Sequence, residues 1–306
     1  MISGGIDIGG TKIEARLFAA DFTTIERRRL ATPKDDLAGF MAVLVDQVEW
    51  LQNVSRSKAL AVGVAFPGLI DPGTKRAFTS NLPAGGHAIE YILAEKVGRC
   101  LPMINDCQAF ALSEANGGAG DGFKTIVGLI MGTGVGAGLV SGGALAERLN
   151  GSALEIGHAG VPQRTLAPRG LPLWSCGCGK QGCFEQYVSG PGLVALSKFR
   201  LGEHVTPPEL VKRANNGEAN CSAVLTEFIE IAAELLLLIQ LNHDPDCIVI
   251  GGGLSAIQGL GEQLSDALGA LRLGEMRPPA LRIARHGDSS GARGAAMLAK
   301  KIMDEA

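Results

Sequence analysis

Short apolar runs, glycine-rich turns and stretches of helical period alternate along this chain. Residues 4–18 predict two strands joined at Gly9-Gly10-Thr11, and residues 24–31 predict a third strand. From position 37 to position 51, apolar residues recur at helical spacing, which marks the buried face of a helix. The alternation of strand, turn and helix continues to the end of the chain and predicts an α/β fold.

The remaining elements follow from the same patterns. Apolar runs predict strands, and apolar residues at helical spacing predict helices. The predicted strands are 59–65, 101–104, 125–131 and 247–250, and the predicted helices are 88–98, 109–115, 222–242 and 290–303, with a further helix beginning near Cys183.

A faint internal repeat relates two parts of the chain. Ile8-Gly9-Gly10-Thr11 and Met131-Gly132-Thr133-Gly134 each follow an apolar strand and precede a second strand. Each half would then open with a hairpin whose turn is glycine and threonine. Two such halves facing each other across a cleft are typical of actin-like ATPases and sugar kinases.

Length, composition and charge narrow the class of protein. A chain of 306 residues is expected to form two domains, and 46% hydrophobic with 19% charged residues indicates a globular protein. A net charge of −3 without a basic tract predicts no binding to nucleic acid or to a membrane surface. The N-terminus lacks a secretory pattern, and Glu227, Glu230 and Glu234 interrupt the most apolar helix. We therefore expect a cytoplasmic protein without a membrane span.

One histidine and three clustered cysteines make a full set of tetrahedral zinc ligands: His158, Cys176, Cys178 and Cys183. A closed set of four leaves no position for catalysis, so the predicted role of zinc is structural. The alternative is a pocket histidine beside free cysteines, but three cysteines within eight residues, spaced by glycines, favour metal. The long interval between His158 and Cys176 is the unusual feature of this set.

The other four cysteines stand in apolar surroundings in the sequence. Their positions predict reduced core residues and not disulfides, because a chain of this kind is expected in a reducing compartment. They are Cys100, Cys107, Cys221 and Cys247.

Two glycine turns are candidates for binding phosphate. In Asp7-Ile8-Gly9-Gly10-Thr11-Lys12, glycine allows backbone N–H groups to approach anionic oxygens, and Asp7 is a candidate to hold Mg²⁺ directly or through water. Gly132-Thr133-Gly134-Val135-Gly136-Ala137-Gly138 offers a second cradle. Either loop alone is as readily a plain hairpin turn, and the two together favour phosphate. The chain has no P-loop motif, and the second loop leads into a strand, which excludes a dinucleotide fingerprint.

Asp106 is the candidate general base. It follows the apolar run 101–104 and precedes a helix, so it lies at a strand end, where α/β proteins bind ligands. A helix N-cap is the alternative for an aspartate in this position. The phosphate loops and two further acids, Glu155 and Glu185, favour a base that accepts the proton of an attacking hydroxyl.

Together these motifs resemble the ROK family of sugar kinases over essentially the whole chain. The matches are D-I-G-G-T-K at 7–12, G-V-A-F-P-G at 63–68, N-D at 105–106, G-T-G-V-G-A-G at 132–138, E-I-G-H at 155–158, C-G-C-G-K-Q-G-C-F-E at 176–185, I-G-G-G-L-S at 250–255 and R-H-G-D-S-S-G-A-R-G-A-A at 285–296. The resemblance implies an α/β, two-domain, actin-like (ribonuclease H-like) ATPase fold with an interdomain cleft. We expect a smaller domain of residues 1–115 plus 291–306 and a larger one of 116–290 that carries the zinc loop.

The resemblance also implies roles for individual residues. Asp106 would deprotonate the sugar 6-hydroxyl, and His158 would use one ring nitrogen for zinc and the other for the sugar. The loops at 7–12 and 132–138 would hold the phosphates of MgATP, with direct in-line transfer. The sugar would contact Asn81, Asn105, Glu155, His158 and Glu185, and Gly252 and Gly253 would pack near the adenosine.

The residues after Asn81 favour N-acetylglucosamine as the sugar. Leu82-Pro83-Ala84-Gly85-Gly86 lacks the tryptophan common in glucose and fructose members, and its small residues leave room for an N-acetyl group. The alternatives are kinases of fructose, mannose, glucose or N-acetylmannosamine. A sugar-sensing regulator is a further alternative. Regulators of the family carry a DNA-binding domain before the first phosphate loop, and we expect no room for that domain before Asp7 here. A homodimer is common in the family, although no residue here demands one.

Three residues depart from the family pattern. Leu154 and Arg148 stand where glycine is usual, near Glu155, and Gln108 stands where asparagine is usual. The first two predict a reshaped loop around Glu155. They bear on which sugar is bound and not on phosphate transfer.

Overall fold

The computed structural model describes residues 1–79, 82–146 and 148–305, with the backbone alone at Asp288. It comprises two compact units. Unit 1 is Met1–Gly117, Gly138–Ala153 and Asp288–Ala306, and unit 2 is Gly118–Ala137 and Leu154–Gly287. Residues 138–153 thus belong with the N-terminal part of the chain, whereas the sequence placed them in the larger domain; the predicted domain division itself stays a prediction. Among the described residues, no helix is long and apolar enough to cross a bilayer.

A five-stranded mixed sheet forms the centre of unit 1. Its order is β3 (Thr24–Ala31), β2 (Lys12–Phe18), β1 (Ser3–Ile8), β4 (Ala61–Phe66) and β7 (Met103–Asn105). β1 to β3 are antiparallel neighbours, whereas β1, β4 and β7 run parallel. The predicted hairpin at residues 4–18 and the next strand are therefore confirmed. The short strands β5 (Leu69–Ile70), β6 (Ala77–Phe78) and β10 (Ala144–Leu145) complete the strands of this unit.

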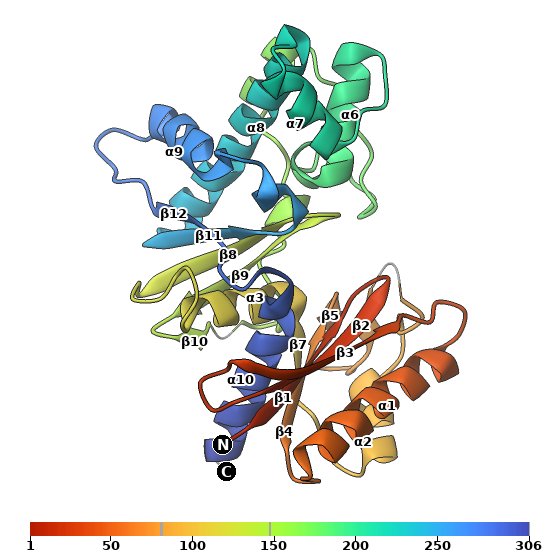
Figure 1. The fold of residues 1–306 in the computed structure, drawn as a ribbon. Helices are drawn as coiled ribbons and strands as arrows, with labels where there is room; N and C mark the ends of the chain where they lie inside the picture. The colour runs from red at the N-terminus through yellow and green to blue at the C-terminus, as the bar shows by residue number, and fades with distance from the viewer. Residues whose placement is uncertain (80–81, 147, 306) are drawn as a thin grey trace. The chain divides into compact units, whose positions relative to one another are not determined.

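Helices cover both faces of this sheet (Figure 1). α1 (Leu37–Ser55) begins after the N-cap Asp36, and with α2 (Ile89–Val97) it packs its apolar face on one side. α3 (Asp106–Ala115) and α10 (Ser290–Glu305) lie on the other side. Burial of apolar surface between these layers is the main source of stability.

The backbone of α10 lies directly on the sheet. A Cβ added at Gly5 would lie 1.8 Å from the Ala292 carbonyl oxygen, and one added at Gly63 would lie 2.1 Å from the Ala295 carbonyl oxygen. Side chains at these two positions would push the helix away. Glycine is therefore required in β1 and β4 by close approach of the helix backbone.

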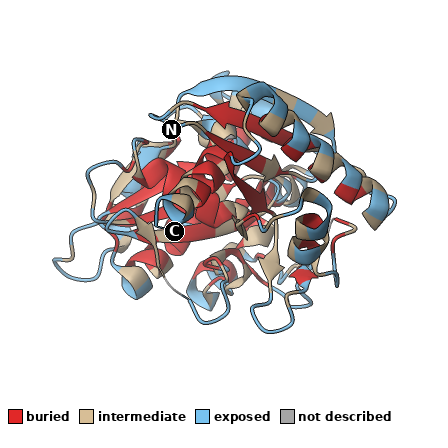
Figure 2. Ribbon diagram, turned by 90° about the horizontal axis from the view of Figure 1, so that it is seen from below, coloured by how far each residue is buried: buried red, intermediate tan, exposed pale blue. Residues whose placement is uncertain are grey.

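Unit 2 is built on the strands β9 (Val135–Ser141), β8 (Thr125–Met131), β11 (Cys247–Gly251) and β12 (Ala280–Ile283), in that order. β11 is parallel to both β8 and β12. β9 passes into unit 1 after Ala137, where its last residues pair with β10. β11 is buried throughout and β8 and β9 are mostly buried, whereas β12 is half-buried to exposed. Figure 2 colours the ribbon by burial, with buried residues in red.

The helices of unit 2 gather around α8 (Ala219–His243), which is buried along most of its length. It packs against α6 (Gly190–Leu201), α7 (Pro207–Asn215) and α9 (Leu260–Leu271). Short helical turns, α4 (Gln163–Leu166), η2 (Ala167–Arg169) and α5 (Glu185–Val188), occupy the region of the cysteine cluster. The predicted helix at 222–242 is confirmed, whereas α4, α6, α7, α9 and β12 were not predicted.

Two expectations are wrong. Cys100 is exposed in the loop between α2 and β7, although its apolar neighbours predicted a core residue. The second glycine loop is shorter than predicted, because Val135 to Gly138 already form the start of β9. Gly136 is therefore a strand residue, and only residues 132–134 form the turn.

Candidate functional site

The four predicted zinc ligands of unit 2 come together. One donor atom from each of His158, Cys176, Cys178 and Cys183 lies within 4.8 Å of every other. The distance from His158 Nδ1 to Cys176 Sγ is 3.6 Å, and the distance from Cys178 Sγ to Cys183 Sγ is also 3.6 Å. Thiolates about 2.3 Å from a tetrahedral zinc ion are about 3.8 Å apart, whereas disulfide sulfurs are about 2.05 Å apart. The donor set and its spacing therefore fit zinc and exclude a disulfide.

Backbone hydrogen bonds shape the chain around this cluster. Cys176 N donates to the Lys180 carbonyl at 2.8 Å, and Gly179 N donates to the Cys176 carbonyl at 3.0 Å. Gly179 has a φ of +84°, which favours glycine at that point of the turn. An isolated bridge joins Gly160 to Cys183 and brings the histidine and cysteine segments side by side.

The thiols differ in their acidity. Burial raises the pKa of Cys183 to about 12. The pKa of the Cys178 thiol is lowered, chiefly by a hydrogen bond from the backbone of Lys180. Metal binding at this cluster therefore has to displace protons, as is usual for thiolate ligands.

The orientation of His158 assigns its two ring nitrogens. Nδ1 faces Cys176 Sγ, so this nitrogen is on the metal side and Nε2 is left for a different partner. His158 is the last residue of the 3₁₀ turn η1 (Ile156–His158), and its backbone N–H donates to the Glu155 carbonyl at 3.0 Å. A metal bond at Nδ1 makes Nε2–H a hydrogen-bond donor.

β9 supports the segment that carries Glu155. Leu154 and Ala137 exchange two backbone hydrogen bonds of 2.7 and 3.1 Å. A Cβ on Gly157 would lie 2.0 Å from the Val135 carbonyl oxygen, so the turn can pack here only with glycine. Leu154 itself is buried, whereas Arg148 is exposed. Leu154, which stands where the family usually has glycine, is thus a core residue beside Glu155. Its side chain leaves the backbone pairing with Ala137 intact.

Glu185 connects the cysteine loop to the glycine loop. It begins α5, two residues after Cys183, and its Oε2 accepts a hydrogen bond from Val135 N at 2.9 Å. A Cβ on Gly134 would lie 2.7 Å from the same oxygen. The position of this carboxylate is therefore set from both sides, by the cysteine loop and by the start of β9.

Three glycine segments of unit 2 converge around the 132–134 turn. Gly190 N donates to the Gly132 carbonyl at 2.8 Å, which brings the first turn of α6 to the loop. Gly252 has a φ of +83°, and a Cβ there would lie 2.5 Å from the Met131 carbonyl. A glycine turn packed against a helix start and a second glycine segment is a backbone arrangement that suits an anion. Gly190 was not predicted as part of the site, although Ser189-Gly190-Pro191 is a recognisable helix start.

The first glycine turn lies between β1 and β2 in unit 1. Gly9 N donates to the Lys12 carbonyl at 2.8 Å, and Gly10 and Thr11 are exposed. Thr32 Oγ1 donates to the Gly9 carbonyl at 2.7 Å and holds the turn from β3, a role that no sequence motif indicated. Asp7, at the end of β1, lies beneath the first turn of α10, where a Cβ on Gly291 would come within 2.6 Å of its carboxylate.

Asp106 is the first residue of α3 and not its cap. Asn105 caps the helix by accepting from Cys107 N at 2.8 Å and Gln108 N at 3.3 Å, and Gln108 Oε1 accepts from Asn105 N. Gln108, which departs from the family pattern, thus completes a capping box. Burial raises the pKa of Asp106, against the opposing effect of the hydrogen bond from Cys107 N. A carboxyl with a raised pKa at a strand end is suited to accept a proton.

Two predicted sugar contacts have a different standing. Asn105 uses its side chain to cap α3 and to donate to the Gly68 carbonyl at 2.9 Å, so its first role is structural. Asn81 lies outside the described residues. Contact of either asparagine with a sugar stays a prediction.

Comparison with known proteins places the chain in a family. A model of the ROK family matches residues 3–302. N-acetylgalactosamine kinase AgaK of Shewanella sp. (strain ANA-3) is 36% identical over 96% of this chain and 95% of its own. N-acetyl-D-glucosamine kinase of Erwinia tasmaniensis is 38% identical over 97% of this chain and 99% of its own. A ROK glucokinase from Streptomyces griseus, solved with glucose and AMPPNP, is 29% identical with a TM-score of 0.76, over 98% of this chain and 100% of its own.

Proposed function

The chain belongs to the ROK family and is a sugar kinase, and we propose that it transfers the γ-phosphate of ATP to the 6-hydroxyl of N-acetyl-D-glucosamine. The observation that carries this proposal is the arrangement of unit 2, where the cysteine cluster fixes His158 and the start of β9 fixes Glu185. The product pair would be the sugar 6-phosphate and ADP.

Asp106 would act as the general base. The sugar hydroxyl has to lose its proton as it attacks phosphorus, and a nearby carboxylate accepts that proton. Burial raises the pKa of Asp106, which makes it a better acceptor than an exposed aspartate. Asp106 is in unit 1 and the ring-binding acids are in unit 2.

Glu155, His158 and Glu185 would bind the sugar ring. Carboxylates accept hydrogen bonds from ring hydroxyls, and His158 Nε2–H would donate one while Nδ1 faces the metal. Zinc would be bound by the four Cys and His donors and would act structurally, because a closed tetrahedral set has no position for substrate. Asn81 and Asn105 would add further contacts to the sugar.

MgATP would bind at the glycine segments. In unit 1 these are Gly9, Gly10, Thr11 and Lys12, with Asp7 as the residue that holds Mg²⁺. In unit 2 they are Gly132, Thr133 and Gly134, with Gly252 and Gly253 near the adenosine. The convergence of Gly190 and Gly252 on the 132–134 turn supports the second set. Gly136, inside β9, is a less direct participant.

The related enzymes support an N-acetylated hexose as the substrate, but the sugars in their names differ at one carbon. N-acetylglucosamine and N-acetylgalactosamine are epimers at C4, and relatives of both kinds match this chain over nearly its full length. N-acetylgalactosamine is thus the second candidate. A coupled assay of ADP release with both sugars, N-acetylmannosamine and glucose tests the proposal. A kcat/KM for N-acetylglucosamine below that for any of the others would contradict the choice.

Cytoplasmic location and a homodimer are further parts of this proposal. The family resemblance favours both. Fractionation of the native host and light scattering of the purified chain test them.

A further inference from the structure

The interval of seventeen residues between His158 and Cys176, here named the connection (159–175), follows a defined path. Its ends are fixed by the cluster: Val161 N donates to the Gly182 carbonyl at 2.8 Å, and Ser175 pairs with Gln181. Its middle consists of α4 and η2, of four and three residues. Helical turns this short are not stable alone in water, so external contacts have to hold them.

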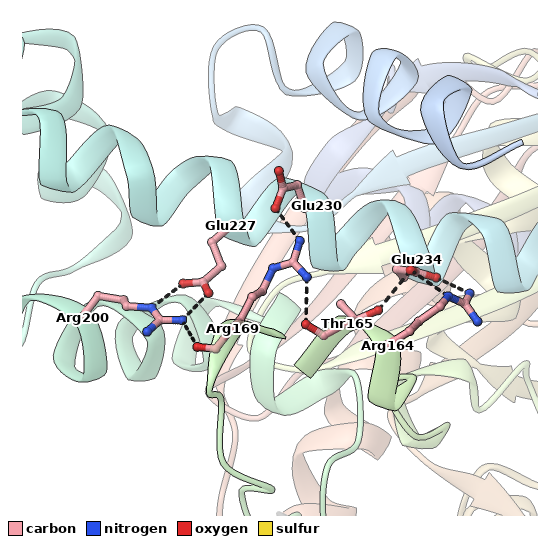
Figure 3. A network of polar contacts seen from close by, with 7 residues as sticks. All are labelled: Arg164, Thr165, Arg169, Arg200, Glu227, Glu230 and Glu234. Atoms are coloured by element: carbon pink, nitrogen blue, oxygen red, sulfur yellow. Dashed lines mark hydrogen bonds and ion pairs between the residues drawn. The ribbon is translucent and has the colours of Figure 1, made fainter. Parts of the chain in front are cut away.

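α8 supplies these contacts through three glutamates that the sequence placed in an otherwise apolar helix. Glu234, Glu230 and Glu227 lie along one side of α8, and each meets an arginine (Figure 3). Glu234 pairs with Arg164 and Glu230 with Arg169, so the connection runs antiparallel to α8. Glu234 and Glu230 thus dock the connection, whereas Glu227 pairs with Arg200 of α6.

Glu234 has the most buried side chain of the three glutamates. Its carboxylate is buried, with 7% of the side chain exposed. It accepts from Arg164 Nη2 at 2.6 Å, Arg164 Nε at 3.2 Å and Thr165 Oγ1 at 3.0 Å. Thr165 is itself buried. A buried carboxylate is tolerated only when such donors compensate it, so Glu234 fixes both the position and the rotation of α4.

Ion pairs and hydrogen bonds of Arg169 and Arg200 attach η2 as well. Arg169 donates to Glu230 at 2.5 Å and to the Thr165 carbonyl at 2.8 Å, and Arg200 donates to the Arg169 carbonyl at 2.6 Å. The side chains of Glu230 and Glu227 are 48% and 11% exposed, against 7% for Glu234, and exposed ion pairs contribute little each. The side chain of Arg164 is itself 64% exposed, so the contact on which the path of the connection depends is the buried one between Glu234 and Thr165.

We propose that Glu234 is a positioning residue for the metal cluster, and through His158 for the sugar-binding residues, because it determines how the connection returns from His158 to Cys176. This inference rests on the proposed function. Glu234 has no direct role in the chemistry. It acts through Arg164 and Thr165 on the geometry of the two ligands that the connection joins.

The test compares Glu234→Ala, Glu234→Gln and Thr165→Val with wild-type holoenzyme. The measurements are the rate of zinc transfer to an excess of a chromogenic chelator, the KM for sugar, the KM for ATP, kcat and the melting temperature. Loss of a residue that supports a metal ligand typically costs about 10- to 100-fold in metal affinity or activity. We expect Glu234→Ala to release zinc about tenfold faster or more and to raise the sugar KM about tenfold, with the ATP KM unchanged.

The conservative variants keep the proposal testable if Glu234→Ala does not fold. Glu234→Gln retains the length of the side chain and an oxygen that accepts from Thr165, so its zinc release should lie between wild type and alanine. Thr165→Val removes only the hydroxyl and should change zinc release in the same direction. Glu203→Gln, which breaks the exposed pair with Arg213 in the same unit, is the control and should match wild type.

Two results would overturn the inference. One is zinc release and sugar KM in Glu234→Ala within about twofold of wild type, well below the effect expected of a supporting residue. The other is a parallel rise of both KM values with a lower melting temperature, which indicates general destabilisation. Failure of the proposed function is distinguishable, because wild-type protein would then lack zinc or fail to phosphorylate sugar before any variant is compared.

Discussion

The backbone N–H of Val135 donates to Glu185 Oε2 over 2.9 Å, and the carbonyl of the same residue lies where a side chain on Gly157 would be. One residue at the start of β9 therefore touches both acid-bearing segments, the turn after Glu155 and the first turn of α5. This arrangement gives the two carboxylates a common support that is separate from the Cys and His cluster. Their relative position depends on both supports.

Gly134→Ala should weaken sugar binding without unfolding the protein. The added Cβ would lie 2.7 Å from Glu185 Oε2, and a carboxylate at the end of a side chain can move away at little cost. We expect a rise in sugar KM of about tenfold or more, since a misplaced binding group loses about 1–2 kcal/mol of a charged hydrogen bond. Steady-state kinetics and a melting curve measure the two effects.

Gly177→Ala is the matched control for that variant. It lies in the cysteine loop, has ordinary φ, and nothing lies within 4 Å of an added Cβ. Kinetics close to wild type are expected. Equal sugar KM values in the two variants would show that crowding at Glu185 is not what matters.

Serine at Cys178 should impair metal binding, whereas serine at Cys100 should not. Both thiols are exposed, but only Cys178 belongs to the cluster of four donors. Metal analysis of wild type and Cys100→Ser should find about one zinc per chain, because a tetrahedral site of four ligands binds one ion. Cys178→Ser should retain less zinc and lose sugar affinity. Full activity in zinc-free protein would separate the metal from sugar binding.

Replacement by alanine should lower the free energy of unfolding at Gly63 and raise it at Gly269. At Gly63 the new Cβ would lie 2.1 Å from the Ala295 carbonyl, so α10 has to shift from the sheet at a cost of about 1–3 kcal/mol or more. At Gly269, within α9, nothing lies within 4 Å of the new Cβ. Alanine there should stabilise by about 0.5–1 kcal/mol, because it is the better helix former. Denaturant unfolding measures both, and a stabilised Gly63→Ala would refute the close packing of α10.

Apolar patterning predicted β1, β4, β8 and β11 because these strands are buried on two faces and carry apolar runs. It did not predict β12, which is half-buried to exposed. The same reasoning missed α4, since a four-residue turn is too short to have a period and forms only against Glu234. It also missed Gly190 and Thr32, whose parts in the glycine turns arise from backbone contacts far apart in sequence.

The neighbouring residues Asn105 and Asp106 mark another limit of sequence reasoning. Both residue types are good caps, and only the backbone geometry decides that Asn105 has extended φ and ψ while Asp106 begins the helix. The exposure of Cys100 is a similar case, because apolar neighbours do not determine whether a loop is covered. The cluster of His158 with three cysteines was predictable because its donor chemistry is specific, although the long interval within it was explained only by the path of the connection.

Asp106→Asn should abolish most catalysis while sugar still binds. Removal of a general base typically lowers kcat by about 10²- to 10⁴-fold. In wild type, kcat/KM for the sugar should fall as the pH drops through the raised pKa of Asp106, because the protonated carboxyl cannot accept a proton. Rapid-quench assays and sugar titrations over pH measure these effects, and near-normal turnover of the variant would refute the role of base.

The same substitution should make the protein more stable at neutral pH. Burial raises the pKa of Asp106 in the folded state above its unfolded value of about 3.9, so the ionised carboxylate opposes folding above the folded pKa. The gain in melting temperature from Asp106→Asn should therefore be present at pH 7 and shrink as the pH falls through the folded pKa toward the unfolded one. Asp71→Asn is the control, since the backbone N–H of Thr74 lowers the pKa of that exposed aspartate and its loss should give no gain. A lower melting temperature for Asp106→Asn at pH 7 would contradict the assigned burial of this acid.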